Sequence, residues 1–177
     1  LIGFSHPAAN RKFDWNLADA SWTKDHIALF TGTKKELITY FQNKFDTLKG
    51  IYNKLPKSVI HNDVNHNNIV VSTHLKDPEL TGIIDFGDTV YSQTINDLAI
   101  VLAYAIMELP DPLAAAVDVI RGYHKEYSIS EEVLQCLYTL VGMRLVTTVT
   151  KAALRKAEDP TNRYWTISEQ PAWELLK

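Results

Sequence analysis

The sequence predicts an α+β protein that is predominantly α-helical. Three short runs rich in β-branched residues, at 58–60, 69–71 and 81–84, are bounded by polar or turn-forming residues, with a charged turn at 74–79. The segments on either side carry apolar residues at helical spacing. Because no internal repeat or low-complexity stretch occurs, we expect residues 1–177 to form a single domain with a small sheet-like insert.

The first part of the chain leads into one long helix. The first 31 positions are mixed: Phe13, Trp15, Leu17 and Trp22 are separated by polar residues, and Asp14 or Asn16 is able to cap a short turn. Thr33 is a plausible N-cap for the long helix, whose apolar residues keep 3.6-residue spacing down one side. Pro56 is expected to end it, because proline disfavours helical backbone in the preceding residue.

Residues 92–177 are expected to form a helical subdomain. An apolar helix begins near Asn96 and runs to Leu109. The next helix has Asp111 as N-cap and Pro112 as first helical residue, and it reaches about residue 127.

Two further helices complete the subdomain. Ser130 is the predicted N-cap of a long helix that runs to about Ala157, with acidic residues in its positively polarised first turn. Asp159 and Pro160 end this helix, and Ser168 is positioned to cap a last short one.

Composition excludes several classes of function. Charged residues make up 22% of the chain and the net charge is -3, so nothing is basic enough to follow a nucleic-acid backbone. No apolar run approaches the roughly 18 residues needed to cross a bilayer, and no signal-like segment opens the chain. We therefore expect no nucleic-acid or membrane partner and a cytoplasmic location. Cys136 is the single cysteine, which excludes an internal disulfide.

Residues 58–88 hold the polar groups that are able to do chemistry. The first β-branched run ends at His61, the second begins after Asn68, and the third ends in the sequence DFGD. Because these runs stop abruptly at acids and amides, we expect the polar groups to share one rim of a small sheet. Asp63, Asn68 and Asp85 are oxygen ligands of the kind that Mg²⁺ takes. A carboxylate beside such an ion can accept the proton of an attacking hydroxyl, so the pattern indicates phosphoryl transfer.

The motif H-x-D-x-x-x-x-N at 61–68, followed by I-D-F-G at 84–87, resembles the aminoglycoside phosphotransferase and choline kinase superfamily, relatives of the protein kinases. The opening GFSHPAANRKFDWNL and the closing RYWTISEQPAWELL resemble its hydroxylysine kinase-like branch. The resemblance implies that the chain is the C-terminal, larger lobe of a kinase-like fold. It covers nearly all of the chain.

The same resemblance implies roles for individual residues. Asp63 would be the catalytic base, His61 the brace of its loop, and Asn68 and Asp85 the metal ligands. The implied cofactor is Mg²⁺, the implied phosphoryl donor is ATP or GTP, and the implied acceptor is a small hydroxyl-bearing amine. Asp97 resembles the acid that ties the helical lobe to the catalytic loop, and we interpret it as a helix cap or buried structural support.

Other polar and aromatic residues each have two interpretations. Asp88 either assists the metal or hydrogen-bonds loop amides. Arg144 interrupts an apolar helix face, so it either pairs with an acid in the core or binds a substrate carboxylate. Trp165 and Trp173 either hold a substrate ammonium by cation–π attraction or pack the C-terminal segment.

Two rival functions stay open. His66 with His61, Asp63, Asp85 and Asp88 permits a transition-metal hydrolase site, although no H-E-x-x-H pattern occurs. The chain also lacks G-x-G-x-x-G and Walker loops and has no room for an N-terminal nucleotide lobe, which would be its partner in the full-length protein. We therefore expect the chain alone to have little or no activity, and a non-catalytic kinase-like binding or regulatory module is the alternative.

Overall fold

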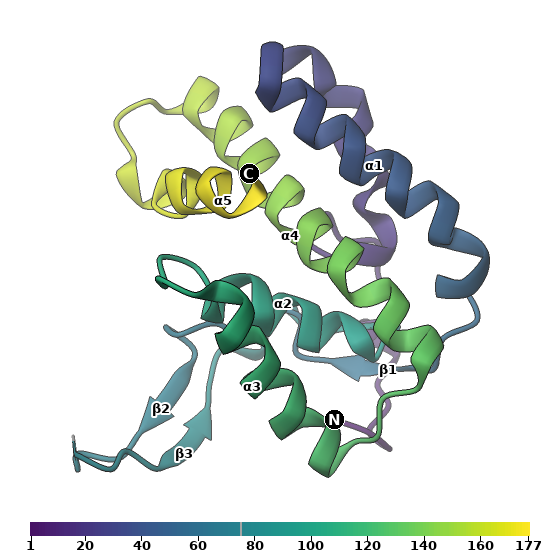
Figure 1. Ribbon diagram of the computed structural model, residues 1–177, viewed down its shortest axis with the longest axis vertical. Helices are drawn as coiled ribbons and strands as arrows, with labels where there is room; N and C mark the ends of the chain where they lie inside the picture. Colours follow the sequence, from purple (N-terminus) through teal and green to yellow (C-terminus); the bar gives the residue numbers. More distant parts are fainter. Residues whose placement is uncertain (75) are drawn as a thin grey trace.

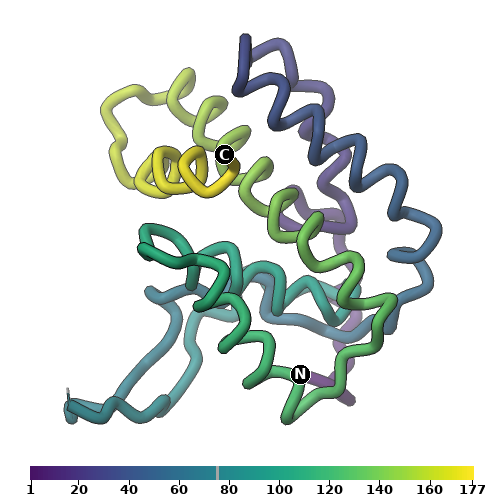
Figure 2. Tube along the Cα trace, viewed as in Figure 1, coloured from purple at the N-terminus to yellow at the C-terminus, as the bar shows by residue number. Residues whose placement is uncertain are grey.

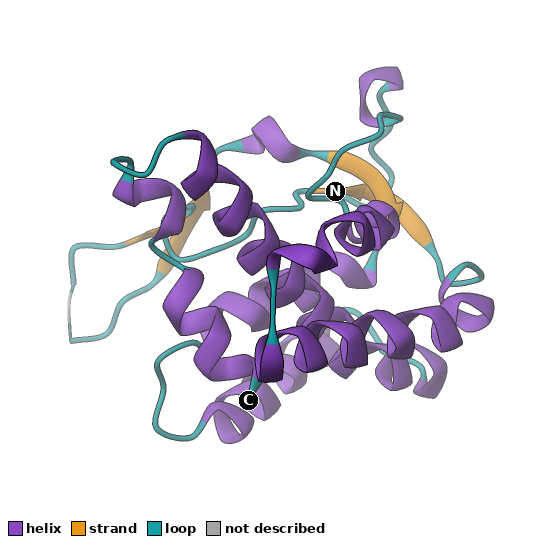
Figure 3. Ribbon diagram, turned by 90° about the horizontal axis from the view of Figure 1, so that it is seen from above, coloured by secondary structure: helices purple, strands orange, loops and turns teal. Residues whose placement is uncertain are grey.

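Helices make up most of the chain in the computed structural model, which describes residues 1–74 and 76–177 (Figure 3). Part of the expected turn at 74–79 therefore lies outside the described residues, because Leu75 is not among them. The elements in chain order are η1 (Pro7–Ala9), η2 (Leu17–Leu29), α1 (Gly32–Tyr52), β1 (Lys57–Ile60), β2 (Ile69–Val71), β3 (Leu80–Ile83), η3 (Phe86–Asp88), β4 (Val90–Gln93), α2 (Ile95–Ala105), α3 (Pro112–Glu126), α4 (Glu131–Glu158), η4 (Arg163–Thr166) and α5 (Glu169–Leu176). The predicted α+β class with a helical majority is confirmed.

The strands form two separate antiparallel ribbons. β1 pairs with β4, so that Ile60 lies opposite Val90, and β2 pairs with β3, so that Ile69 lies opposite Ile83. The expectation that the strands share one small sheet is therefore wrong for the described residues. Because β2 and β3 are neighbours in sequence, they pair locally, and β4 takes the edge of β1. Figure 2 shows the β2–β3 ribbon projecting away from the helices.

α4 is the central helix of the molecule. It contacts α1, α2, α5 and η2, and Figure 1 shows it passing between α1 and α2. Its middle is buried on all sides, and the core there includes Cys136, Leu140, Met143 and Val146. An 18-residue window of α4 is apolar enough to cross a membrane by length and composition, contrary to the expectation from sequence. Of that window, 72% is buried inside the protein, as befits a helix that is apolar on every face because it lies in a core.

The ends of two helices differ from those predicted. α1 begins at Gly32, so Thr33 lies inside the helix and Thr31 is the N-cap residue. α1 also ends at Tyr52, before Pro56, because a tight turn follows in which the N–H of Lys54 bonds the carbonyl of Ile51 at 2.9 Å. α2 ends at Ala105 and not at Leu109, since Glu108 adopts a left-handed backbone with φ of 60°.

Three predicted caps are confirmed. The side-chain oxygen of Asn16 accepts from the N–H of Ala18 at 3.2 Å and starts η2. The Asp111 carboxylate accepts from the third residue after it at 3.0 Å, and the Ser130 hydroxyl does the same at 3.4 Å. Satisfying the free N–H groups of a first turn in this way fixes where α3 and α4 begin.

Candidate active site

The loop at 61–68 and the DFGD segment are joined through the peptide groups of Ile84. The Ile84 N–H donates to the Asn68 carbonyl at 3.0 Å, and the Ile84 carbonyl lies 2.9 Å from His61 Nε2. His61 Nδ1 accepts from the Asp63 N–H at 3.3 Å, so Nε2 carries the ring proton and donates. Asp85 follows Ile84 directly and is therefore fixed relative to the loop. These are the contacts expected of His61 as a brace.

Asp97, in the first turn of α2, supports the start of the same loop. Its two carboxylate oxygens accept from the N–H groups of His61 and Asn62 at 3.1 and 2.8 Å. Asn62 has φ of 68°, a left-handed conformation, so the chain changes direction directly after these two N–H groups. Burial raises the pKa of the Asp97 carboxyl, and the two N–H bonds oppose that shift. These contacts fit the interpretation of Asp97 as a buried structural support of the loop.

Asp63 is held by three side-chain donors. Oδ1 accepts from Arg144 Nη2 at 3.0 Å, while Oδ2 accepts from Asn65 Nδ2 at 3.1 Å and from Asn68 Nδ2 at 3.0 Å. The Asp63 side chain is still 25% exposed. A fixed carboxylate that keeps some access to solvent is able to meet a substrate hydroxyl.

Asn68 and Asp85 are the oxygen ligands that the sequence predicts for a metal. The Asn68 amide nitrogen is directed at the backbone carbonyl and side chain of Asp63, so its oxygen faces the other way. Asp85 is exposed, takes φ of 60°, and accepts from the Gly87 N–H at 3.3 Å through one oxygen. Among the described residues, neither the Asn68 amide oxygen nor the second Asp85 carboxylate oxygen accepts a hydrogen bond, and oxygens of these two kinds fit the ligand preference of Mg²⁺.

Asp88 faces the charges of both segments. Burial is the main cause that raises the pKa of its carboxyl, and the charge of Asp63 adds to the shift, while Arg144 and Arg11 oppose it. Arg11 also donates to the Gly87 carbonyl at 2.7 Å, which ties the N-terminal segment to this turn. The DFGD segment therefore lies close enough to Asp63 and Arg144 for their charges to act on Asp88.

The rival transition-metal site finds no support in the described part of the chain. Within residues 1–74 and 76–177, no group of three or more His, Cys, Asp or Glu side chains is placed to hold a metal ion. His66 is exposed at the outer end of the loop, whereas His61 is buried and already bonded to Ile84. Imidazole and carboxylate ligands thus do not converge as a hydrolase of that type requires.

Arg144 is almost completely buried, with 1% of its side chain exposed. Besides Asp63, it donates from Nη2 to the Tyr104 hydroxyl at 3.2 Å and from Nη1 to the Trp15 carbonyl at 3.2 Å. Its guanidinium carbon lies 4.7 Å from the centre of the Trp15 ring. Of the two interpretations from sequence, these contacts correspond to pairing with an internal acid, and a bond from Arg144 to a substrate stays a prediction.

A cavity of about 810 Å³ opens beside Asp63. It extends along α4, and its lining includes Tyr104, Glu108, Lys151, Arg155 and Trp165. The Arg155 guanidinium stacks over the Trp165 ring at 4.5 Å. Trp165 thus shares a cavity with Asp63, whereas Trp173 is 3% exposed and packs in the core against Phe30.

Comparison with known proteins gives this arrangement a family. Residues 3–132 match the phosphotransferase enzyme family. The chain belongs to that family. It is also similar to hydroxylysine kinases: 26% identical to that of Xenopus laevis over 94% of this chain and 47% of the relative. It is 25% identical to the hydroxylysine kinase of Mus musculus, over 100% of this chain and 50% of the relative. It is 24% identical to that of Danio rerio, over 100% of this chain and 54% of the relative.

These likenesses confirm the superfamily and the hydroxylysine kinase-like branch that the sequence motifs indicate. The chain spans about half the length of the curated relatives it matches. The matched region of the phosphotransferase family includes the whole of 61–88, and α4 continues beyond its end.

Sequence reasoning missed three residues of this candidate site, namely Tyr104, Trp15 and Arg155. The first two contact Arg144, and the third stacks on Trp165. A partial signal was present for Arg144, because a charge on an apolar helix face demands a partner. Nothing in the sequence indicated that the partner would be Asp63, since the two residues are separated by 81 positions.

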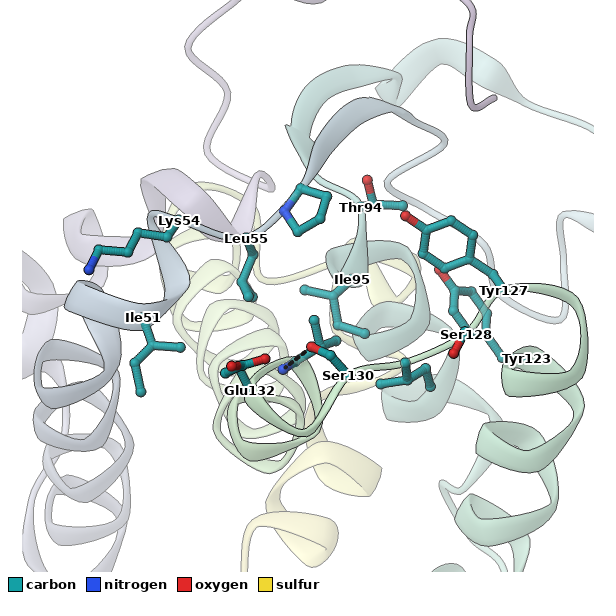
Figure 4. Close-up of a pocket in the computed structure, with 13 residues that line it drawn as sticks. Ile51, Lys54, Leu55, Thr94, Ile95, Tyr123, Tyr127, Ser128, Ser130 and Glu132 are labelled. Carbon is teal, nitrogen blue, oxygen red and sulfur yellow. Dashed lines mark hydrogen bonds between the residues drawn. The ribbon is translucent and has the colours of Figure 1, made fainter.

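A second cavity of the protein lies away from Asp63 (Figure 4). Its volume is about 480 Å³, and it is lined by the C-terminal ends of α1 and α3 and the N-terminal ends of α2 and α4. Leu55, Ile95, Tyr123 and Tyr127 give it a mainly apolar wall. It contains none of the residues predicted from the kinase-like motifs, so the candidate active site is the cavity at Asp63.

Proposed function

We propose that this chain is the catalytic part of a small-molecule kinase that transfers the γ-phosphate of a nucleoside triphosphate to a hydroxyl of an amino acid or amino alcohol. The observation that carries the proposal is the Asp63 carboxylate, held by Arg144, Asn65 and Asn68 and still exposed to a cavity. The hydroxylysine kinases to which the chain is similar support this class of acceptor.

Asp63 acts as the base in this proposal. The acceptor hydroxyl donates a hydrogen bond to the carboxylate, which directs its oxygen at the γ-phosphorus. As the new O–P bond forms and the bond to the bridging oxygen breaks, the hydroxyl proton passes to Asp63 and the nucleoside diphosphate leaves. Positioning contributes most of the rate, because a loose transition state asks little covalent chemistry of the protein.

Asn68 and Asp85 would hold Mg²⁺ through their free amide and carboxylate oxygens. The bound ion would supply positive charge to the phosphate oxygens of ATP or GTP. Asp85 is kept in place for this role by the bonds of Ile84 to His61 and Asn68. Asp88 lies near enough to assist the same group of ligands.

The acceptor fits the cavity that runs along α4 from Asp63. Arg155 presents a guanidinium stacked on Trp165, a partner for a substrate carboxylate, and it lies three turns, or about 16 Å, beyond Arg144 on the same helix. Glu108 faces the same cavity in a strained left-handed conformation and offers a carboxylate to a substrate ammonium. Trp165 adds the aromatic wall that attracts cations.

The N-terminal nucleotide lobe of the family is the proposed partner in the full-length protein. Support comes from the coverage of about half of each curated relative and from apolar residues on the β2–β3 ribbon that are exposed, among them Val71, Leu80 and Ile83. A non-catalytic binding module is the alternative function, and the apolar cavity at Tyr123 and Tyr127 favours it because that cavity is separate from the catalytic motifs.

The test is phosphorylation of a panel of hydroxyamines, with hydroxylysine among them, by residues 1–177 and by the same chain with its native flanking sequence. We expect turnover in the longer form, loss of at least about 1,000-fold in Asp63→Asn, and no change in the matched control Asp118→Asn, whose carboxylate lies exposed on α3. No turnover in either form, together with no binding of Mg²⁺-nucleotide, would overturn the kinase in favour of the binding module.

A further inference from the structure

The hydrogen bonds at Asp63 distinguish its two oxygens. An ionised carboxylate has about four acceptor positions, two on each oxygen. Oδ2 takes two donors, Asn65 and Asn68, and is filled, whereas Oδ1 takes only Arg144. One acceptor position therefore remains, and it lies on Oδ1, the oxygen bonded to Arg144.

Arg144 is itself fixed by groups from separate parts of the chain. The Trp15 carbonyl precedes η2, Tyr104 lies on α2, and Asp63 lies in the loop after β1. The Trp15 and Tyr104 rings also lie 4.7 and 5.3 Å from the guanidinium carbon. A buried guanidinium with this many partners has little freedom to turn toward a ligand.

We propose that Arg144 is the positioning residue of Asp63, and that Oδ1 of Asp63 is the atom that accepts the proton of the substrate hydroxyl. This inference rests on the proposed kinase activity and deepens it. Arg144 holds Oδ1 on one side, and the two amides hold Oδ2, so the carboxylate cannot rotate about its Cβ–Cγ bond. The free acceptor position on Oδ1 then points in one fixed direction, toward the cavity that Asp63 lines. The side chain of Asp63 is 25% exposed, so a ligand is able to reach it.

The alternative for Arg144 is a direct bond to a substrate carboxylate. That role needs a guanidinium that reaches the cavity, and Arg144 is 1% exposed and absent from the cavity lining, in contrast to Arg155. Its Nε lacks a hydrogen-bond partner among the described residues, but this atom is buried as well. Arg144 thus acts through Asp63 and not on the acceptor.

The experiment compares Arg144→Met and Arg144→Lys with the wild type in the full-length polypeptide, under saturating nucleotide and varied acceptor. We expect Arg144→Met to lower kcat about 100-fold with acceptor KM within about twofold, as for a reactive group displaced by a small distance. Arg144→Lys keeps the charge and one donor, so it should recover kcat to within about tenfold of the wild type.

Two further variants separate positioning from a merely structural role. In an Asp63→Asn background, adding Arg144→Met should lower the single-turnover rate by less than about threefold relative to Asp63→Asn alone, because Arg144 acts only through Asp63. Tyr104→Phe keeps the buried ion pair but releases Nη2 on one side, and it should lower kcat by about three- to tenfold with unchanged KM. This variant carries the test if Arg144→Met does not fold.

Three results would overturn the proposal for Arg144. If the wild type turns over no acceptor, the kinase proposal fails and this inference fails with it. If the wild type is active but Arg144→Met raises acceptor KM at least tenfold at constant kcat, Arg144 is a substrate ligand and the inference is wrong. An equal loss in the wild-type and Asp63→Asn backgrounds would also overturn it, since that indicates general structural damage.

Discussion

Asp97 places a buried negative charge directly beneath the candidate catalytic loop. Its two oxygens accept hydrogen bonds from the N–H groups of His61 and Asn62. Burial raises the pKa of the Asp97 carboxyl above its ordinary value. The residue thus fixes the loop while opposing the stability of the fold at neutral pH.

The pH dependence of stability should reveal that opposition. Since the folded-state pKa lies above the unfolded value of about 3.9, the folded protein binds the Asp97 proton more readily than the unfolded chain does. The contribution of Asp97 to the free energy of unfolding is therefore greatest below pH 3.9 and is lost as pH rises through the folded pKa. In urea unfolding of wild type and Asp97→Asn, we expect the wild type to gain stability relative to the variant as pH is lowered from 7 toward 4. A difference that is constant with pH, or that shrinks on acidification, would contradict this.

At this scale the sequence identified the motif residues but not their partners. The spacing of His61, Asp63 and Asn68 and the DFG triplet was sufficient to propose roles, because each role belongs to a short local pattern. The bond between Asp63 and Arg144 joins residues 81 positions apart, and only folding brings them together. A short local pattern carries no information about a contact between residues so far apart in the sequence.

At the scale of the elements, the Phe41 ring of α1 packs directly onto Gly142 of α4. A Cβ atom built at Gly142 would overlap the ring of Phe41, which is 5% exposed on α1. Glycine is required there because the Phe41 ring occupies the space that a Cβ atom would fill. α4 otherwise follows ordinary helical packing, with its apolar residues turned to α1 and α2.

Gly142→Ala should therefore destabilise the protein even though alanine favours helix. We expect a loss of about 1–3 kcal/mol in the free energy of unfolding, because the Phe41 ring must leave its position in a packed core. The matched control is Gly122→Ala on α3, where no atom lies within 4 Å of the new Cβ and the change should stabilise by up to about 1 kcal/mol.

Urea unfolding of both variants measures this, and Phe41→Leu combined with Gly142→Ala should recover part of the loss. Equal effects at the two glycines would contradict the prediction, because they would show that the Phe41 ring moves aside without cost.

Element boundaries were predictable where a side chain marks them. Asn16, Asp111 and Ser130 each accept a hydrogen bond at the start of a helix, and such caps are visible in sequence. The ends of α1 and α2 were placed too late, because helical spacing of apolar residues continues into the turns that follow. β4 was missed since Val90–Gln93 forms a strand only through its pairing with β1, some thirty positions earlier.

For the molecule as a whole, the site joins segments from across the sequence. Trp15 near the N-terminus, Asp63 in the loop after β1 and Tyr104 on α2 all bond the guanidinium of Arg144 on α4. The N-terminal segment also reaches the DFGD turn through Arg11. Any event that separates α4 from the rest must therefore break the candidate site as well, so its integrity depends on the global fold.

Reaction of the buried Cys136 thiol offers a way to measure how often the global fold opens. Its thiol is 0% exposed on α4, packed in the same core as the helices that support Arg144, and burial raises its pKa. A thiol-specific reagent should react with it only when the core opens, at least about 1,000-fold more slowly than with the chain in urea. Timed labelling followed by mass spectrometry measures how often the core opens, and no residue has to be introduced for it because Cys136 is already present. Reaction at the unfolded rate would contradict a closed core, and slower labelling with Mg²⁺-nucleotide present would tie the openings to the site.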